Sequence, residues 1–369
     1  MTPRERTLAC LNEKPIDRLP AVHFGFWRET LHKWADEGHL SREEAEAYQD
    51  GNRIDGALSE RLGFDHCWTC TVSPNTDLDP FFDEETEKEL PDGSRHVRNA
   101  EGVVELDVPG TTSIRSAIRH TLVDRESWDY HYKWRLQWNP GRLAGLENPR
   151  PSGPDRPIGL WCGSLIGKIR NMLGVEGLAY MGEDDPELLD EIVGTVGALC
   201  LRSVEETLRR VDTPDFAHFW EDICYNHGPL VNPRFFAGKI VPWYRRISGV
   251  LNDHGIGLVS VDCDGCIDTL VPHWLDAGVN IMFPIEVGTW KASIGPWRNQ
   301  YGKALKGVGG VRKSVFAGDK AAVDEEIERL RPLIDLGGYI PCPDHRIPPE
   351  AKWDLVCYYT KRLRTLPLQ

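Results

Sequence analysis

The second half of the chain alternates short apolar runs with amphipathic helical patterns, and this alternation constrains the fold more than any other feature. After residue 156, six apolar runs have the length of a strand, and stretches of helical periodicity separate them. The runs cover residues 157–165, 215–223, 257–265, 280–287, 305–311 and 337–344. Strands that alternate with crossover helices are typical of βαβ units, so we predict a parallel sheet.

The intervening helices carry recognisable start signals. In residues 184–211, Asp185 is placed as an N-cap and Pro186 follows at the first helical position. Leu189, Ile192, Val193, Val196 and Leu199 then repeat at helical spacing. Residues 348–366 have a similar pattern and close the chain with a helix.

The N-terminal half supplies two more candidate strands, at residues 18–27 and 66–74. Eight strands with crossover helices predict an α/β protein with a (β/α)8 TIM barrel, in which the whole chain, 1–369, forms one domain. Residues 81–110 alternate polar and apolar side chains around a Pro-Asp-Gly turn, so we expect an antiparallel β excursion inserted in this half. The insertion and its irregular connection occupy about residues 75–155.

The composition narrows the class of partner. The formal net charge is −14, from 43 basic and 57 acidic side chains, which disfavours nucleic acid and anionic membranes. We therefore expect a small-molecule substrate, and a homodimer is compatible with the sequence. The N-terminus lacks the apolar run of a signal peptide, and no run has the roughly 18 apolar residues of a membrane span, so we expect a cytoplasmic protein.

Polar residues gather where the predicted strands end, which is where barrel enzymes place their chemistry. The first strand contributes His23, and Arg170 follows the third. The candidate residues at the later strand ends are Glu221, Asp222, Asp262, Asp264, Glu286, Arg312 and His345. His345 is suited to metal ligation or to general acid and base catalysis because its pKa lies near neutrality.

The segment 259–268, VSVDCDGCID, combines two aspartates with two cysteines. Alternate side chains of a strand point to the same side, so Asp262 and Asp264 should share a face that Cys263 does not. Two carboxylates this close require a cation, a proton or an arginine between them. Capping of the next helix by Asp264 is the structural alternative.

The cysteines of this segment permit a different interpretation. Together with Cys67 and Cys70, Cys263 and Cys266 could form a four-thiolate zinc site, or either pair could be redox-active. The gap of 263 − 70 = 193 positions is far from the spacing of a zinc ribbon, so packing is the preferred interpretation.

Four segments of the chain resemble the uroporphyrinogen decarboxylase superfamily, which has a barrel fold. These segments are residues 5–27, 219–247, 261–288 and 337–364. The resemblance covers most of the chain and is weakest at about 75–155. True uroporphyrinogen decarboxylases carry an arginine-rich loop after the first strand, whereas this chain has Arg28 alone there. The resemblance therefore favours the branch related to corrinoid-dependent methyltransferases.

That branch implies a set of roles for the candidate residues. This branch has the zinc motif His-x-Cys-Gly. The glycine of the motif matches Gly265, its two ligand positions fall on Asp262 and Asp264, and a third ligand position falls at His345. The resemblance implies a demethylase that moves a methyl group from a small methylated substrate to a corrinoid on a partner protein. We expect a divalent metal, zinc first, at those three residues, with Glu221 as a further catalytic group. Substrate contacts are expected from His23, Arg170, Asp222, Glu286 and Arg312, the two arginines binding an anionic part.

Two other functions stay open at this point. A metal-independent decarboxylase could use Asp262 or Asp264 to stabilise a protonated, electron-rich substrate. A barrel that binds a ligand without catalysis is also compatible with the sequence, because a fold does not define an activity.

Overall fold

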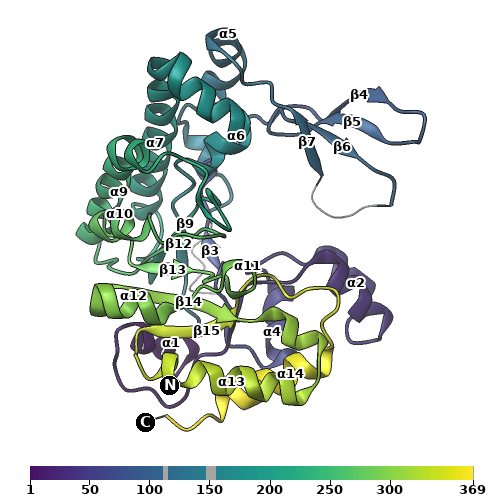
Figure 1. The fold of residues 1–369 in the computed structure, drawn as a ribbon, viewed down its shortest axis with the longest axis vertical. Coiled ribbons are helices and arrows are strands. Elements are labelled where there is room, and N and C mark those ends of the chain that lie inside the picture. Colours follow the sequence, from purple (N-terminus) through teal and green to yellow (C-terminus); the bar gives the residue numbers. More distant parts are fainter. Residues whose placement is uncertain (111–114, 147–154, 369) are drawn as a thin grey trace.

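A computed structural model describes residues 1–110, 115–146 and 155–368 of the chain. Its main sheet has seven parallel strands, which appear across the middle of Figure 1. In sheet order they are β15 (Tyr339–Pro343), β14 (Lys306–Val311), β13 (Ile281–Phe283), β12 (Val259–Asp262), β9 (Phe216–Trp220), β8 (Gly159–Trp161) and β3 (Thr71–Val72). The protein is therefore a mixed α/β protein with a large parallel sheet.

Two further strands form a separate parallel pair. Strand β1 (Val22–His23) pairs with β2 (His66–Cys67), and β2 lies just before β3 in the chain. The segments that follow β1 and β15 meet in a parallel bridge between Phe26 and Ile347. The predicted strand 66–74 is thus divided into two short strands, and the other predicted strands lie where the alternation placed them.

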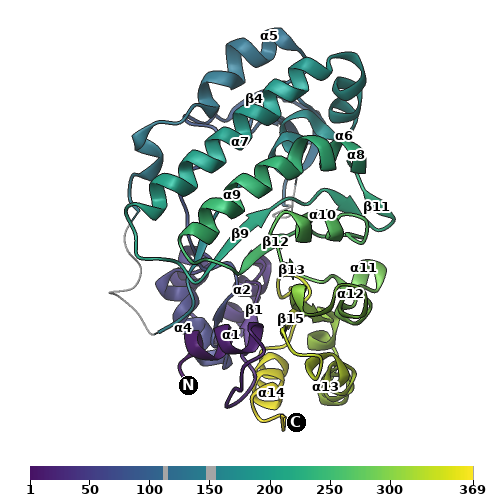
Figure 2. The ribbon, with the colours of Figure 1, turned by 90° about the vertical axis from the view of Figure 1, so that its left-hand side faces the viewer.

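Helices alternate with these strands and surround them (Figures 1 and 2). On the N-terminal side they are α1 (Pro3–Leu11), α2 (Arg28–Asp36), α3 (Arg42–Ala47) and α4 (Arg53–Leu62). The later ones are α6 (Gly167–Asp184), α7 (Pro186–Leu208), α9 (Val241–Asp253), α10 (Val271–Asp276), α11 (Val287–Trp290), α12 (Ile294–Tyr301), α13 (Lys320–Ile334) and α14 (Trp353–Arg364). Helix α7 begins as predicted, with the Asp185 side chain accepting a hydrogen bond from the Leu188 N–H. Its apolar face, from Leu188 to Leu208, is buried.

An antiparallel sheet projects from the body between β3 and β8 (Figure 1). Its four strands are β4 (Glu85–Glu89), β5 (Arg95–Arg98), β6 (Val104–Asp107) and β7 (Ser116–Arg119). It corresponds to the predicted excursion at 81–110 and extends beyond it. Short helical segments follow between Arg125 and Leu143, where Trp128 is buried and Trp134 is exposed.

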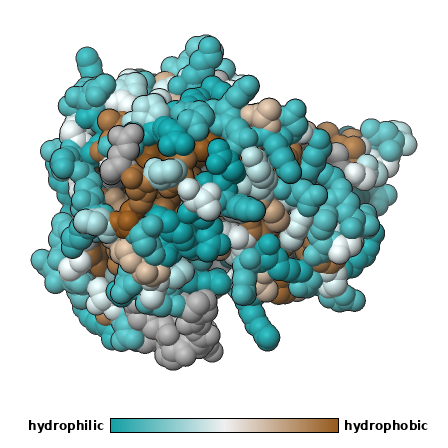
Figure 3. Space-filling view, turned by 90° about the horizontal axis from the view of Figure 1, so that it is seen from below, coloured by the Kyte–Doolittle hydropathy of each residue, from teal (hydrophilic) through white to brown (hydrophobic). Residues whose placement is uncertain are grey.

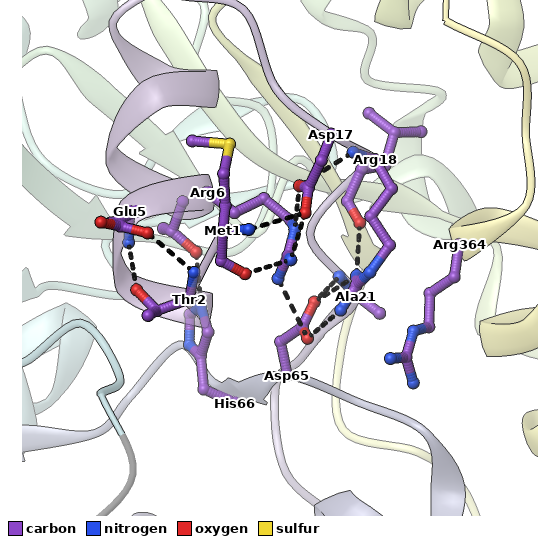
Figure 4. A network of polar contacts seen from close by, with 12 residues as sticks. Met1, Thr2, Glu5, Arg6, Asp17, Arg18, Ala21, Asp65, His66 and Arg364 are labelled. Atoms are coloured by element: carbon purple, nitrogen blue, oxygen red, sulfur yellow. Dashed lines mark hydrogen bonds and ion pairs between the residues drawn. The ribbon is translucent and has the colours of Figure 1, made fainter.

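A network of ion pairs anchors the N-terminal helix to the strands (Figure 4). Arg6 of α1 bonds Asp17 at 2.7 and 2.9 Å, and its guanidinium lies 3.5 Å from Asp65. Asp65 also accepts two hydrogen bonds from Arg18, at 2.6 and 2.8 Å. Because Arg6 and Asp65 are buried, these bonds fix the approach to β1 and β2.

The face shown in Figure 3 is mostly hydrophilic, with several smaller hydrophobic areas between the polar side chains. Within the described residues, no helix is both long and apolar enough to span a lipid bilayer.

Candidate active site

A large cavity lies where the parallel strands end. It has a volume of about 740 Å³, and its wall includes the ends of β9 and β12, residues that follow β15, and the segments 69–77 and 141–144. The polar lining contains Asp50, Thr69, Thr71, Ser73, Asn75, Asp77, Arg142, His218, Asp222, Asp262, Asp264, His345 and Arg346. The aromatic lining contains Phe24, Trp27, Phe81, Trp161 and Trp220. A cavity of this kind at the carboxyl ends of parallel strands is the expected place for a ligand.

Three carboxylates form the centre of this cavity. Oxygen atoms of Asp222, Asp262 and Asp264 all lie within 4.8 Å of one another. Asp262 ends β12, and Asp264 follows it by two residues, so strand alternation puts both on the cavity side. Cys263 between them is buried in the hydrophobic core, as the alternation predicted.

Burial and neighbouring negative charges raise the pKa of Asp222 and of Asp262. Burial and the negative charge of Asp264 raise the pKa of Asp222 to about 6. Burial, followed by the charges of Asp222 and Asp264, raises the pKa of Asp262 well above its ordinary value, and Arg346 opposes that shift. The cluster therefore favours a bound cation or a bound proton.

Several polar atoms around the cluster lack a hydrogen-bond partner among the described residues. They include Oδ1 of Asp264, Nδ1 of His345 and Nδ1 of His218, all of which are buried. No hydrogen bond in the described part of the chain reaches the carboxylate of Asp262, which is 5% exposed. Because Oδ1 of Asp264 accepts no hydrogen bond from a described residue, Asp264 does not act as the cap of the following helix. Buried polar atoms without partners indicate a site that a ligand completes.

His345 lies beside the acidic cluster. Its Nε2 atom is 3.4 Å from Oδ2 of Asp264, and its ring stacks on Trp27 with the centroids 5.4 Å apart. In this cavity the group of ligand atoms within 4.8 Å of one another is Asp222, Asp262 and Asp264, whereas the sequence suggested Asp262, Asp264 and His345. The structure thus brings the expected residues together and adds Asp222 to them.

Glu221 has a structural position instead of a place in the cavity. Its buried carboxylate accepts hydrogen bonds from the N–H groups of residues 165, 166 and 167, at 2.7 to 3.0 Å. Ser164 and Tyr244 donate two more. Both residues follow the end of β9, but Asp222 lines the cavity whereas Glu221 holds the start of α6.

The two arginines expected to bind an anion do not reach the cavity. Arg312 is half exposed, and it forms an ion pair at 3.5 Å with Glu326 of α13. The guanidinium of Arg170 lies over the ring of Trp220, 6.0 Å from its centroid. Glu286 also lies outside the lining, and its carboxylate accepts a bond of 2.9 Å from the Gly265 N–H. It thus supports the turn that follows Asp264.

His23 is fully buried below the cavity and belongs to a second group of potential ligands with Asp55 and Cys67. Its Nδ1 accepts a bond from the Gly25 N–H at 2.9 Å, which leaves the proton of the neutral ring on Nε2. Nε2 lies 2.8 Å from Oγ of Ser59. A protonated nitrogen cannot ligate a metal, so His23 is a buried structural histidine.

Two arginines to which the sequence analysis assigned no role line the cavity. Arg346 forms a double hydrogen bond with Asp50, at 3.0 and 2.5 Å. Arg142 is buried, and its guanidinium donates to backbone carbonyl oxygens of the loops around the cavity. Lys168 bonds the remaining carboxylate, Asp77. The basic side chains that line the cavity are therefore already engaged. No arginine among the described residues bonds the central aspartates, although the charges of Arg346 and Arg170 lower the pKa of Asp262 and Asp222, respectively.

Comparisons with known proteins give a likeness of fold. The structure matches a methyltransferase from Methanosarcina mazei with a TM-score of 0.61 and 13% sequence identity, over 98% of each chain. It also matches a putative vitamin-B12-independent methionine synthase from Listeria monocytogenes, with a TM-score of 0.39 and 12% identity over 95% of this chain and 97% of that one. A further match is a B12-independent methionine synthase from Shewanella sp. W3-18-1 in complex with selenomethionine, with a TM-score of 0.45 and 12% identity over 94% of this chain and 98% of that one. No family model and no curated protein matches the sequence. The chain thus shares its fold with a methyltransferase along its whole length.

Proposed function

We propose that this protein is a methyltransferase of the uroporphyrinogen decarboxylase superfamily, whose parallel strands close into a (β/α)8 barrel. It would remove a methyl group from a small methylated substrate and pass it to a corrinoid carried by a partner protein. The observation that carries this proposal is the cluster of Asp222, Asp262 and Asp264 in the main cavity, within the fold of a methyltransferase.

The cluster fits a divalent metal. Three carboxylate oxygens can approach one ion, and Asp264 has an oxygen without a hydrogen-bond partner in the described residues. His345 adds a nitrogen ligand at the edge of the cluster. We propose zinc, and the oxygen-rich ligand set also suits magnesium or manganese. When bound, such an ion would polarise the atom that carries the methyl group.

The remaining cavity residues would bind and enclose the substrate. Trp27 holds the His345 ring by stacking, and Trp161 and Trp220 provide apolar wall. The loop from Thr69 to Asn75 offers hydroxyl and amide groups for a polar substituent. Since the basic side chains are engaged, we propose an uncharged or cationic substrate in place of the anion first expected.

Metal analysis tests the proposal directly. We expect bound metal in the purified protein, and its loss in Asp262→Asn and Asp264→Asn. Asp77→Asn is the matched control, because Asp77 lines the same cavity but bonds Lys168. Full metal content in the two cluster variants would contradict the metal site. A protein without metal that releases carbon dioxide from a carboxylated substrate would support the decarboxylase instead.

Methyl transfer needs a separate assay. We would mix the protein with cob(I)alamin and a panel of methyl ethers, methylamines and methyl thioethers, and follow the absorbance of Co(I). Protein-dependent loss of the Co(I) band with one class of substrate is the expected result. No loss with the whole panel, using metal-loaded protein, would argue against the proposed reaction.

A further inference from the structure

The ion pair between Asp50 and Arg346 separates the main cavity from a second one. The second cavity has a volume of about 290 Å³, and Asp50 and Arg346 line both. Tyr48 lines the second cavity. Asp50 is therefore accessible from the substrate side, and Tyr48 is accessible from the other.

Tyr48 connects Asp50 to a carboxyl group that is almost completely buried. Its hydroxyl lies 3.0 Å from Oδ1 of Asp50 and 3.0 Å from Oδ1 of Asp55. Asp55 is 1% exposed, and its other oxygen accepts a bond of 3.2 Å from the Gly51 N–H. One hydroxyl has one proton, so it can donate to only one of the two carboxyl groups.

The surroundings decide which carboxyl group holds a proton. Asp50 faces the guanidinium of Arg346. Asp55 faces the neutral ring of His23 at 3.5 Å and the thiol of Cys67, and Arg156 acts on it only from further away. Burial, together with the charge of Asp50, raises the pKa of Asp55 to about 6. A protonated Asp55 can donate to Tyr48 while Tyr48 donates to Asp50, which satisfies every group in the line.

We propose that Asp55 and Tyr48 form a proton relay that ends at Asp50 in the wall of the main cavity. The O–H bond of Asp55 breaks as its proton moves to the Tyr48 oxygen, and the original Tyr48 proton moves to Oδ1 of Asp50. Asp55 is left as a carboxylate and Asp50 as a carboxyl group, and no electrons are exchanged. A hydronium ion from solvent that reaches Tyr48 through the second cavity returns a proton to Asp55 by way of the Tyr48 hydroxyl and leaves as water.

The relay has a use in the proposed function, on which this step of the inference rests. Removal of a methyl group from an ether leaves an oxygen that carries a negative charge and needs a proton. Asp50 can supply it at the cavity wall. Tyr48 and Asp55 act through Asp50, so they are positioning and relay residues, whereas Asp50 is the group that touches the substrate.

Infrared spectroscopy tests the relay without any activity assay. In an Asp222→Asn background, which removes the other aspartate whose pKa is raised to about 6, we expect the C=O band of a buried carboxylic acid that grows as the pH falls through about 6. Asp55→Asn should lose this band, and Tyr48→Phe should shift its frequency, because the hydrogen bond to Tyr48 is removed. Tyr358→Phe is the matched control: Tyr358 also bonds an aspartate, Asp324, but at the surface.

The outcomes separate the relay from the proposed function. Spectra of Asp55→Asn that are identical to those of its Asp222→Asn parent would overturn the relay, whatever the protein catalyses. If Asp55→Asn does not fold, an unshifted band in Tyr48→Phe overturns it equally. If methyl transfer is found, Tyr48→Phe should lower kcat by about tenfold or more and alter its pH profile, with KM unchanged. A relay seen by infrared in a protein that transfers no methyl group would refute the proposed reaction alone.

Discussion

Replacing Asp222 by asparagine should make the metal-free protein more stable and its metal binding weaker. Asparagine keeps the oxygen that accepts the 3.1 Å bond from the Asp264 N–H, and it tolerates the positive φ of 46° at this position. The substitution therefore removes a charge with little other change. Higher stability without metal, together with weaker metal binding, is expected only if Asp222 belongs to a cluster of carboxylates that repel one another and bind a cation. An ordinary structural aspartate would not show this combination.

The size of the stability change follows from the pKa of Asp222. A value of about 6 in the folded protein, against an ordinary 3.8, corresponds to about 3 kcal/mol at 1.36 kcal/mol per pH unit. Because Asp262 and Asp264 share the repulsion, we expect an increase of about 1–3 kcal/mol in the free energy of unfolding. The folded state holds the proton of Asp222 more tightly than the unfolded state does. The free energy of unfolding of the wild type therefore falls as the pH rises from about 4 to about 6.

Urea denaturation with a chelator present measures this change. Asp222→Asn should match the wild type near pH 3 to 4 and exceed it above about pH 6. With zinc supplied in place of the chelator, calorimetry should show at least about tenfold weaker binding to the variant. A variant that is less stable than the wild type at neutral pH without metal would refute the reasoning.

Three further substitutions probe the surroundings of the cluster. Glu221→Gln should lower the free energy of unfolding, measured by chemical denaturation, by roughly 2–4 kcal/mol, because it leaves backbone N–H groups at the start of α6 without acceptors. The metal content of this variant should stay unchanged. Arg346→Met should cost about 1–3 kcal/mol by the same measurement, since it removes the ion-pair partner of the partly buried Asp50 and leaves it only the Tyr48 hydroxyl. Trp27→Ala should weaken zinc binding in calorimetry by removing the ring that stacks on His345, with an unchanged melting temperature as evidence against simple unfolding.

The order of strands and helices could be predicted from the sequence because each element has a local pattern of apolar and polar residues. The alternation of apolar runs located β8, β9 and β12 to β15, and Asp185 with Pro186 marked the start of α7. The same periodicity correctly separated Asp262 and Asp264 from Cys263. Local patterns of this kind need no knowledge of contacts between distant segments.

The composition of the cavity depends on such contacts and was predicted only in part. Glu221 and Asp222 are neighbours at the end of one strand, and only the contact of Glu221 with α6 shows which of them is structural. Arg312 was expected at the cavity, but Glu326 of α13 attracts it. Asp50 lies in a loop between two helices and carries no sequence signal for its place beside Arg346.

The division of the cavity wall has a consequence for how proteins with this fold can diversify. The aspartates of the cluster belong to strand ends, which the parallel sheet holds in place. The wall segments 69–77 and 141–144 contain the two-residue strand β3 and otherwise consist of loop and a short helical turn. Natural variation or a directed library confined to those loops could therefore change which compounds are accepted while the reacting groups stay where they are.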